Sequence, residues 1–146
     1  MLRQILVGLV AGLAFLVLDG VLNANPLAQK LYAAYQPIAR VSINAVAGSV
    51  IDLVYGVLLV LLFVVLHASL PGQTNLTKAL SFALVVWLLR VVMRVAGEWV
   101  MTVVPARVHA YTLGAGLLQL VLVACIIALL LPEPHRAGAQ AVGSGL

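Results

Sequence analysis

Charged residues are scarce in this chain. Only 8 basic and 4 acidic residues occur among its 146, and together they make up 8% of the sequence, against about 25% in an ordinary soluble domain. A chain with so few charges cannot maintain a soluble surface, so we expect an integral membrane protein. The basic residues form no cluster, and nucleic acid, which needs a clustered basic face, is not an expected partner.

Cysteine is almost absent, because Cys125 is the only one. An intrachain disulfide is therefore excluded, and so are membrane enzymes whose thiol–disulfide chemistry needs a cysteine pair. The sequence also lacks a phosphate-binding loop, a serine-hydrolase elbow and a zinc-protease motif. No spacing of histidine, cysteine and acidic residues resembles a metal site. With no catalytic motif, enzymatic activity stays undecided.

Long hydrophobic runs are what the sequence does contain, and 64% of its residues are hydrophobic. A membrane-spanning helix needs about 20 mainly apolar residues. Four segments meet this requirement: Leu2–Leu22, Val50–Leu70, Ala79–Val103 and Val108–Leu131. The first is too long for a signal peptide and has no clear cleavage site, so a first spanning helix is favoured.

The four runs are separated by turn signals, and the second and third connections are short. Short connections make neighbouring helices antiparallel, and helices satisfy their own backbone groups in lipid. We therefore predict an all-α integral membrane protein, an antiparallel bundle of four transmembrane helices. Residues 1–136 would form this single domain, and residues 137–146, a low-complexity stretch, would be a flexible tail.

The first connection is long enough to hold an element of its own. Its apolar residues recur at helical spacing: Leu27, Leu31, Tyr35 and Ile38. This pattern predicts a short amphipathic helix that lies at the membrane surface and ends at Pro37. An ordered loop is the alternative.

The orientation in the membrane is poorly determined by the basic residues. One side of the bundle carries Arg3, Lys78 and Arg136, and the other carries Lys30, Arg40 and Arg107. We expect a cytoplasmic N-terminus because its basic residues lie close to helix ends. The expected location is a bacterial inner membrane, crossed several times, with the lipid bilayer as partner. A second copy or a membrane-complex partner is left open.

The third run contains the charges that need an explanation. Arg90, Arg94 and Glu98 are spaced i, i+4 and i+8, so they share one face of a helix. An arginine exposed to lipid costs roughly 2.5–3.5 kcal/mol, and partners are therefore required. Glu98 can pair with Arg94 one turn away. Asp19 and Asp52 are the acids available from the other helices.

Antiparallel threading brings polar residues of separate helices to the same end of the bundle. The candidate ligand-binding residues are Asp19, Asp52, Tyr55, Arg90, Arg94, Glu98, His109 and Thr112. Arginine forks suit carboxylates, phosphates and quinone carbonyls. The sequence thus favours a protein that binds or transports a small polar, anionic or quinone-like molecule. The alternative is an accessory or structural membrane subunit whose charges only specify helix packing and assembly.

Two further expectations concern single residues. His109 could ligate a haem alone, since His67 lies near the opposite end of the bundle; a hydrogen-bonded histidine at the helix end is the alternative. Apart from His67, the opposite end is expected to hold few polar residues. Gly8 and Gly12 form a small-residue face that permits close contact between helices.

Overall fold

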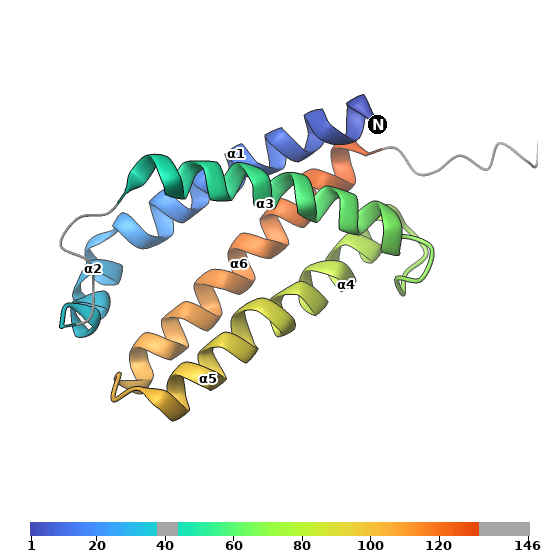
Figure 1. Ribbon diagram of the computed structural model, residues 1–146. Helices are drawn as coiled ribbons and strands as arrows, with labels where there is room; N and C mark the ends of the chain where they lie inside the picture. Colours follow the sequence, from blue (N-terminus) through green and yellow to red (C-terminus); the bar gives the residue numbers. More distant parts are fainter. Residues whose placement is uncertain (38–43, 132–146) are drawn as a thin grey trace, which may run out of the picture.

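The computed structural model describes residues 1–37 and 44–131. These residues contain four helices long and apolar enough to cross a membrane: α1 (Leu2–Ala24), α3 (Ala45–Leu66), the third span Asn75–Met101, and α6 (Ala106–Leu130). Successive spans run in opposite directions (Figure 1). The predicted all-α antiparallel bundle of four transmembrane helices is confirmed. Ile38, Arg40, Arg136 and the predicted tail lie outside the described residues.

The third span is not one regular helix. It consists of α4 (Asn75–Trp87), a π-helical segment η2 (Leu88–Val92) and α5 (Met93–Met101). The N–H of Met93 donates to the carbonyl of Leu88, five residues earlier, which is the π-helical pattern. The wider turn includes Arg90, the first of the charges that interrupt this apolar run in the sequence.

The four spans form two antiparallel pairs. α1 packs on α3, α4 packs on α6, and the pairs meet where α1 contacts α6. In Figure 1 the pairs converge near the N-terminus and diverge toward the end where α2 lies. We call these the N-terminal end and the α2 end of the bundle. The divergence separates the two pairs at the α2 end.

Aromatic and aliphatic side chains fill the core where the pairs converge. Phe15, Phe63, Phe82, Val123 and Ile127 are each at most 2% exposed. By contrast, no more than 28% of the most apolar window of any span is buried. Most of the apolar surface of the spans is therefore not covered within the chain, as expected of a multi-pass protein in contact with the lipid bilayer.

Glycines set the distance between α1 and α3. A Cβ atom on Gly8 would lie 2.7 Å from the Cα of Val57, and one on Gly12 would lie 2.7 Å from the Cα of Leu53. A Cβ on Gly56 would collide with the backbone of Gly12. The predicted small-residue face of α1 is confirmed, and Gly56 completes it from α3.

Side-chain caps explain where the helices begin. Asn25 accepts from the N–H of Ala28 and starts α2 (Pro26–Tyr32), which a 3-10 turn, η1 (Ala33–Tyr35), continues. A helix therefore occupies the predicted place between the first two spans. Asn44 accepts from the N–H of Ala47, so the second span begins at Ala45, before the apolar run that starts at Val50. The sequence allows this extension of the helix toward its N-terminus.

We expect Gly56→Ala to lower the free energy of unfolding by about 1–3 kcal/mol, because the added methyl group forces α1 away from α3. The matched control is Gly48→Ala in the same helix, where a Cβ would meet nothing within 4 Å. Thermal unfolding of both variants in the same detergent measures the difference. Equal stabilities would show that the close approach of α1 and α3 contributes nothing.

Candidate functional site

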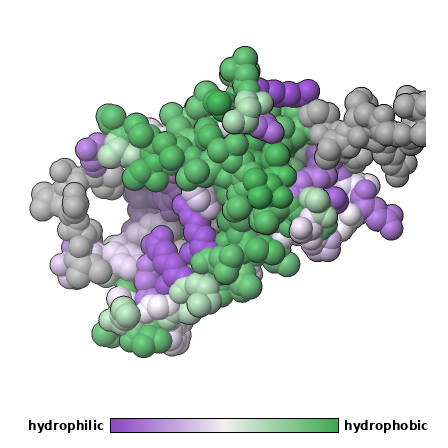
Figure 2. Space-filling view, turned by 45° about the vertical axis from the view of Figure 1, so that its right-hand side comes forward, coloured by the Kyte–Doolittle hydropathy of each residue, from purple (hydrophilic) through white to green (hydrophobic). Residues whose placement is uncertain are grey.

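A polar cavity of about 360 Å³ lies between the two helix pairs at the α2 end. Its lining comes from α1, α2 with η1, the third span and α6, and none of it from α3. The polar lining residues are Asp19, Asn23, Tyr32, Tyr35, Arg90, Arg94, Thr112 and Gln119. Figure 2 shows this region as a hydrophilic hollow bordered by hydrophobic surface. Polar side chains of separate spans therefore gather in one place.

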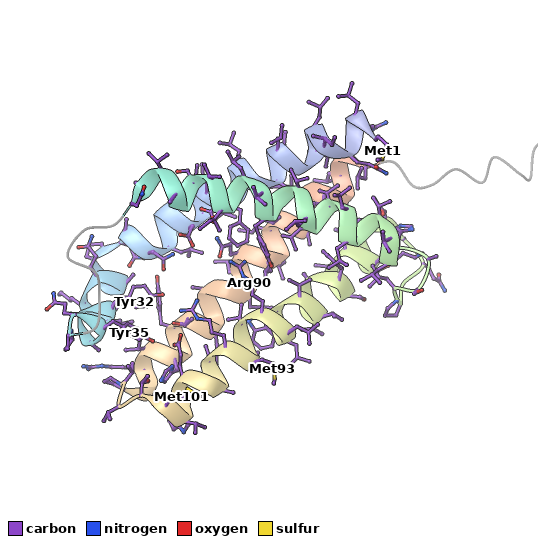
Figure 3. All side chains as sticks on the ribbon, in the orientation of Figure 1. Met1, Tyr32, Tyr35, Arg90, Met93 and Met101 are labelled. Atoms are coloured by element: carbon purple, nitrogen blue, oxygen red, sulfur yellow. The ribbon has the colours of Figure 1, made fainter. Side chains whose placement is uncertain are left out.

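Arg90 points from the π-helical segment toward α3 and α1 (Figure 3). Its guanidinium carbon lies 3.8 Å from the centre of the Tyr55 ring and 4.9 Å from that of Phe15. Stacking of this kind contributes about 0.5–2 kcal/mol. Among the described residues Arg90 makes no salt bridge. The expectation that Asp19 or Asp52 pairs with Arg90 is therefore wrong, because aromatic rings occupy the facing positions.

Arg94 and Glu98 form a short chain of contacts with Tyr35. Nε of Arg94 donates to Oε1 of Glu98 at 2.8 Å, and the Tyr35 hydroxyl donates to Oε2 of Glu98 at 3.0 Å. The side chain of Arg94 is 68% exposed, so this ion pair contributes at most about 1 kcal/mol. The terminal amino groups of Arg94 have no hydrogen-bond partner among the described residues. They remain available at the cavity.

The two aspartates are not equivalent. Asp19 lines the cavity and accepts a hydrogen bond from the side chain of Asn23 at 2.9 Å. Asp52 and Tyr55 belong to α3 and do not line the cavity. Asp52 is partly exposed and lies within electrostatic range of Asp19 and Arg90. The cavity wall thus carries one carboxylate and two guanidinium groups.

The floor of the cavity is formed by α6. The buried amide of Gln119 donates to the carbonyl of Phe15 at 3.2 Å, and the Thr112 hydroxyl donates to the carbonyl of Val108 at 3.0 Å. Gly116 lets η2 approach, since a Cβ there would lie 3.0 Å from the methyl groups of Val91. These bonds fix the floor and leave the arginines as the groups free to meet a ligand.

Tyrosines attach α2 to the rest of the bundle at the mouth of the cavity. The amide of Asn25 donates to the Tyr111 hydroxyl at 2.8 Å, and that hydroxyl donates to the carbonyl of Leu22 at 2.6 Å. The ring of Tyr32 packs edge-on against that of Tyr111. Figure 3 shows Tyr32 and Tyr35 side by side between α2 and the α5–α6 pair. The mouth is therefore closed on one side by aromatic side chains.

His109 does not join the cavity. Its ring is 3% exposed, packs against that of Trp99 at a centroid distance of 5.5 Å, and does not line the cavity. Neither ring nitrogen has a hydrogen-bond partner among the described residues, which disagrees with a hydrogen-bonded histidine at the helix end. Ligation of a haem by His109 gains no structural support.

The N-terminal end holds more polar residues than the sequence suggests. The Asn75 amide donates to the carbonyls of Ala128 and Leu131, and its oxygen contacts Nε2 of His67 at 3.0 Å. Arg3 donates to the carbonyl of Leu130. These donors satisfy carbonyls at the end of α6 that have no helical partner. Their role is to cap a helix, so this second cluster is structural.

The sequence did not predict Asn23, Tyr32 and Tyr35 as cavity residues, and Gln119 was expected on the polar face of its helix but not among the ligand-binding residues. Tyrosines at these positions are typical of interfacial anchors, and the neighbouring sequence does not indicate that Tyr32 and Tyr35 face a polar cavity. Gln119 carried a usable signal, because it lies seven residues after Thr112 and therefore shares its helix face. The π-helical turn at Arg90 has no recognisable signature in the sequence.

Comparison with known proteins now gives the chain a family. The model of a family of unknown function (DUF6789) matches residues 3–131, from the first span to the end of the fourth. The chain belongs to this family. No curated protein and no solved structure shows a significant match. Membership establishes a small membrane protein and assigns no ligand, so the chemistry of the site must come from its residues.

The contact between Tyr35 and Glu98 makes a pH-dependent prediction. Burial and then the Glu98 carboxylate raise the pKa of Tyr35 above its ordinary value of 10.0. A raised pKa in the folded state gives stability that is complete below pH 10 and is lost as the pH rises through the folded value. We therefore expect Tyr35→Phe to be about 1 kcal/mol less stable near pH 8, and the difference to close above pH 10. Melting temperatures of both proteins across this range measure the effect; a constant difference would contradict it.

Proposed function

We propose that this protein binds a small oxyanion, a carboxylate or phosphate group, in the cavity at the α2 end of the bundle. The observation that carries the proposal is the position of Arg90 and Arg94 on one wall of that cavity. Neither guanidinium is tightly held by an acid. Arg90 stacks on aromatic rings, and Arg94 has a single weak partner in Glu98.

The weak pairing between Arg94 and Glu98 allows Arg94 to exchange Glu98 for a ligand. The Arg94–Glu98 pair contributes at most about 1 kcal/mol because it is exposed. A bidentate oxyanion would gain two charge-assisted hydrogen bonds, each about twice as strong as a neutral one. Arg94 can therefore leave Glu98 for a ligand at little cost. The Tyr35 hydroxyl can then remain as the partner of Glu98.

The charges on the cavity wall decide between ligand classes. The wall carries two guanidinium groups and one carboxylate, Asp19, while Glu98 pairs with Arg94 without lining the cavity. A ligand that replaces Glu98 therefore meets two positive charges, and the wall favours an anion over a cation. A quinone carbonyl also accepts hydrogen bonds from arginine, but it carries no full charge to match the second guanidinium. An oxyanion is therefore the better fit. Transport of that anion across a bacterial inner membrane is the larger function into which such a site would fit.

The test is a binding measurement with a soluble probe. We expect butyl phosphate to bind the purified protein in calorimetric titration, and Arg94→Gln to weaken binding about tenfold or more through loss of a charge-assisted pair. Arg107→Gln is the matched control, since Arg107 is exposed at the start of α6 and does not line the cavity. Absence of binding to the unmodified protein, or equal binding by both variants, would refute the proposal.

The alternative function, an accessory subunit whose charges only specify packing, predicts a different result for the same variant. If the charge network holds the bundle together, Arg94→Gln should unfold or fail to assemble. The 68% exposure of the Arg94 side chain argues against this outcome. We expect Arg94→Gln to change the free energy of unfolding by no more than about 0.5 kcal/mol, the range usual for surface substitutions. Thermal unfolding of the variant and the parent protein measures the difference.

A further inference from the structure

We infer that the oxyanion belongs to an amphiphile of the surrounding membrane, which enters the cavity sideways between α3 and α5 with its hydrocarbon chain along α3. This inference rests on the proposed function and specifies the ligand of the same site. The ligand class is therefore an oxyanion head joined to at least one hydrocarbon chain.

The first support is the direction in which the cavity opens. α6 forms its floor, while α1 and the third span form its walls. α3 supplies no lining residue, and among the described residues no span lines the side opposite α6. In Figure 2 the hydrophilic hollow reaches the surface there, between hydrophobic surfaces. A ligand can therefore enter from the side of the bundle as well as past α2.

The second support is depth. Arg90 lies about three helical turns before the end of the third span at Met101, roughly 16 Å along the helix axis. The hydrocarbon core of a bilayer is about 30 Å thick, so this arginine lies at the level of acyl chains. The lateral opening beside Arg90 therefore faces the interior of the membrane. A molecule that arrives there must have a part that is soluble among acyl chains.

The third support is the surface next to Arg90. Tyr55, on which Arg90 stacks, shares one face of α3 with Ile51, Leu58 and Leu62, at spacings i, i+4, i+7 and i+11. Ile51, Leu58 and Leu62 are 63%, 55% and 44% exposed. From Tyr55 to Leu62 this stripe runs about 10 Å toward the N-terminal end, away from the mouth. A head bound at the arginines would leave its chain lying along this stripe.

The bound ligand would keep the direction of a lipid of that leaflet, with its head toward the α2 end and its chain toward the N-terminal end, while the arginines hold its head deeper than the neighbouring headgroups. An acyl chain gains little by moving from lipid to an apolar groove, because both are equally apolar. Selection must therefore come from the head at Arg90 and Arg94. The chain delivers the ligand to the membrane, and the arginines retain it.

A photoactivatable probe tests this inference. The probe is dodecyl phosphate with a diazirine in mid-chain, added to the full chain in nanodiscs of phosphatidylcholine. We expect cross-links to concentrate in the segment from Ile51 to Leu62 and to fall about tenfold in Arg94→Gln, while Arg107→Gln keeps the parent pattern. A phosphatidic acid with the same label shows whether a two-chain amphiphile also enters, and the same arginine-dependent pattern with either probe supports the inference.

Two results would overturn the inference. Cross-links that are spread evenly over the lipid-facing sides of all four spans, or a yield in α3 that is unchanged in Arg94→Gln, mean that the probe only dissolves in the surrounding lipid. If butyl phosphate still binds in an arginine-dependent way, only the lateral amphiphile is refuted. If neither probe responds to Arg94→Gln, the proposed anion site fails with it.

Discussion

An arginine that faces acyl chains costs roughly 2.5–3.5 kcal/mol. This chain carries two arginines, Arg90 and Arg94, in one span. Both are exposed on the chain, and each has a partner within it. The Arg90 guanidinium rests on the Tyr55 ring, and Arg94 reaches Glu98 within a polar cavity. Divergence of the two helix pairs at the α2 end makes room for both side chains.

The divergence is possible because the pairs are held elsewhere. Gly8, Gly12 and Gly56 bring α1 and α3 into backbone contact, and Phe63 and Phe82 pack edge to face where the pairs converge. The bundle is thus tight at the N-terminal end and open at the α2 end. The π-helical turn at Arg90 lies on the border between these regions, where such turns often accompany functional sites.

Hydrophobic runs alone were enough to predict the four spans and their antiparallel order, because lipid leaves a chain few other structures. Partners across the bundle could not be predicted in the same way. Arg90 was expected to meet a carboxylate, but Phe15 and Tyr55 occupy the facing positions, and an aromatic face also accepts a guanidinium. His109 shares the α6 face of the lining residue Gly116, yet it lies almost one turn before Thr112, where it is buried against Trp99. Periodicity gives depth and face, whereas the choice of neighbour depends on how the helices cross.

Water accessibility of the cavity tests the central claim most directly. The experiment introduces single cysteines into a Cys125→Ala background. One replaces Ala115, which lines the cavity, and the other replaces Leu118, which is 50% exposed on the outside of the same helix. Both variants are treated in native membranes with an anionic, membrane-impermeant methanethiosulfonate. A hydrated, arginine-lined cavity predicts rapid modification at position 115 and none at position 118. If the cysteine at position 115 is as unreactive as the one at position 118, the space between the helix pairs is closed to water and anions, and the account is contradicted.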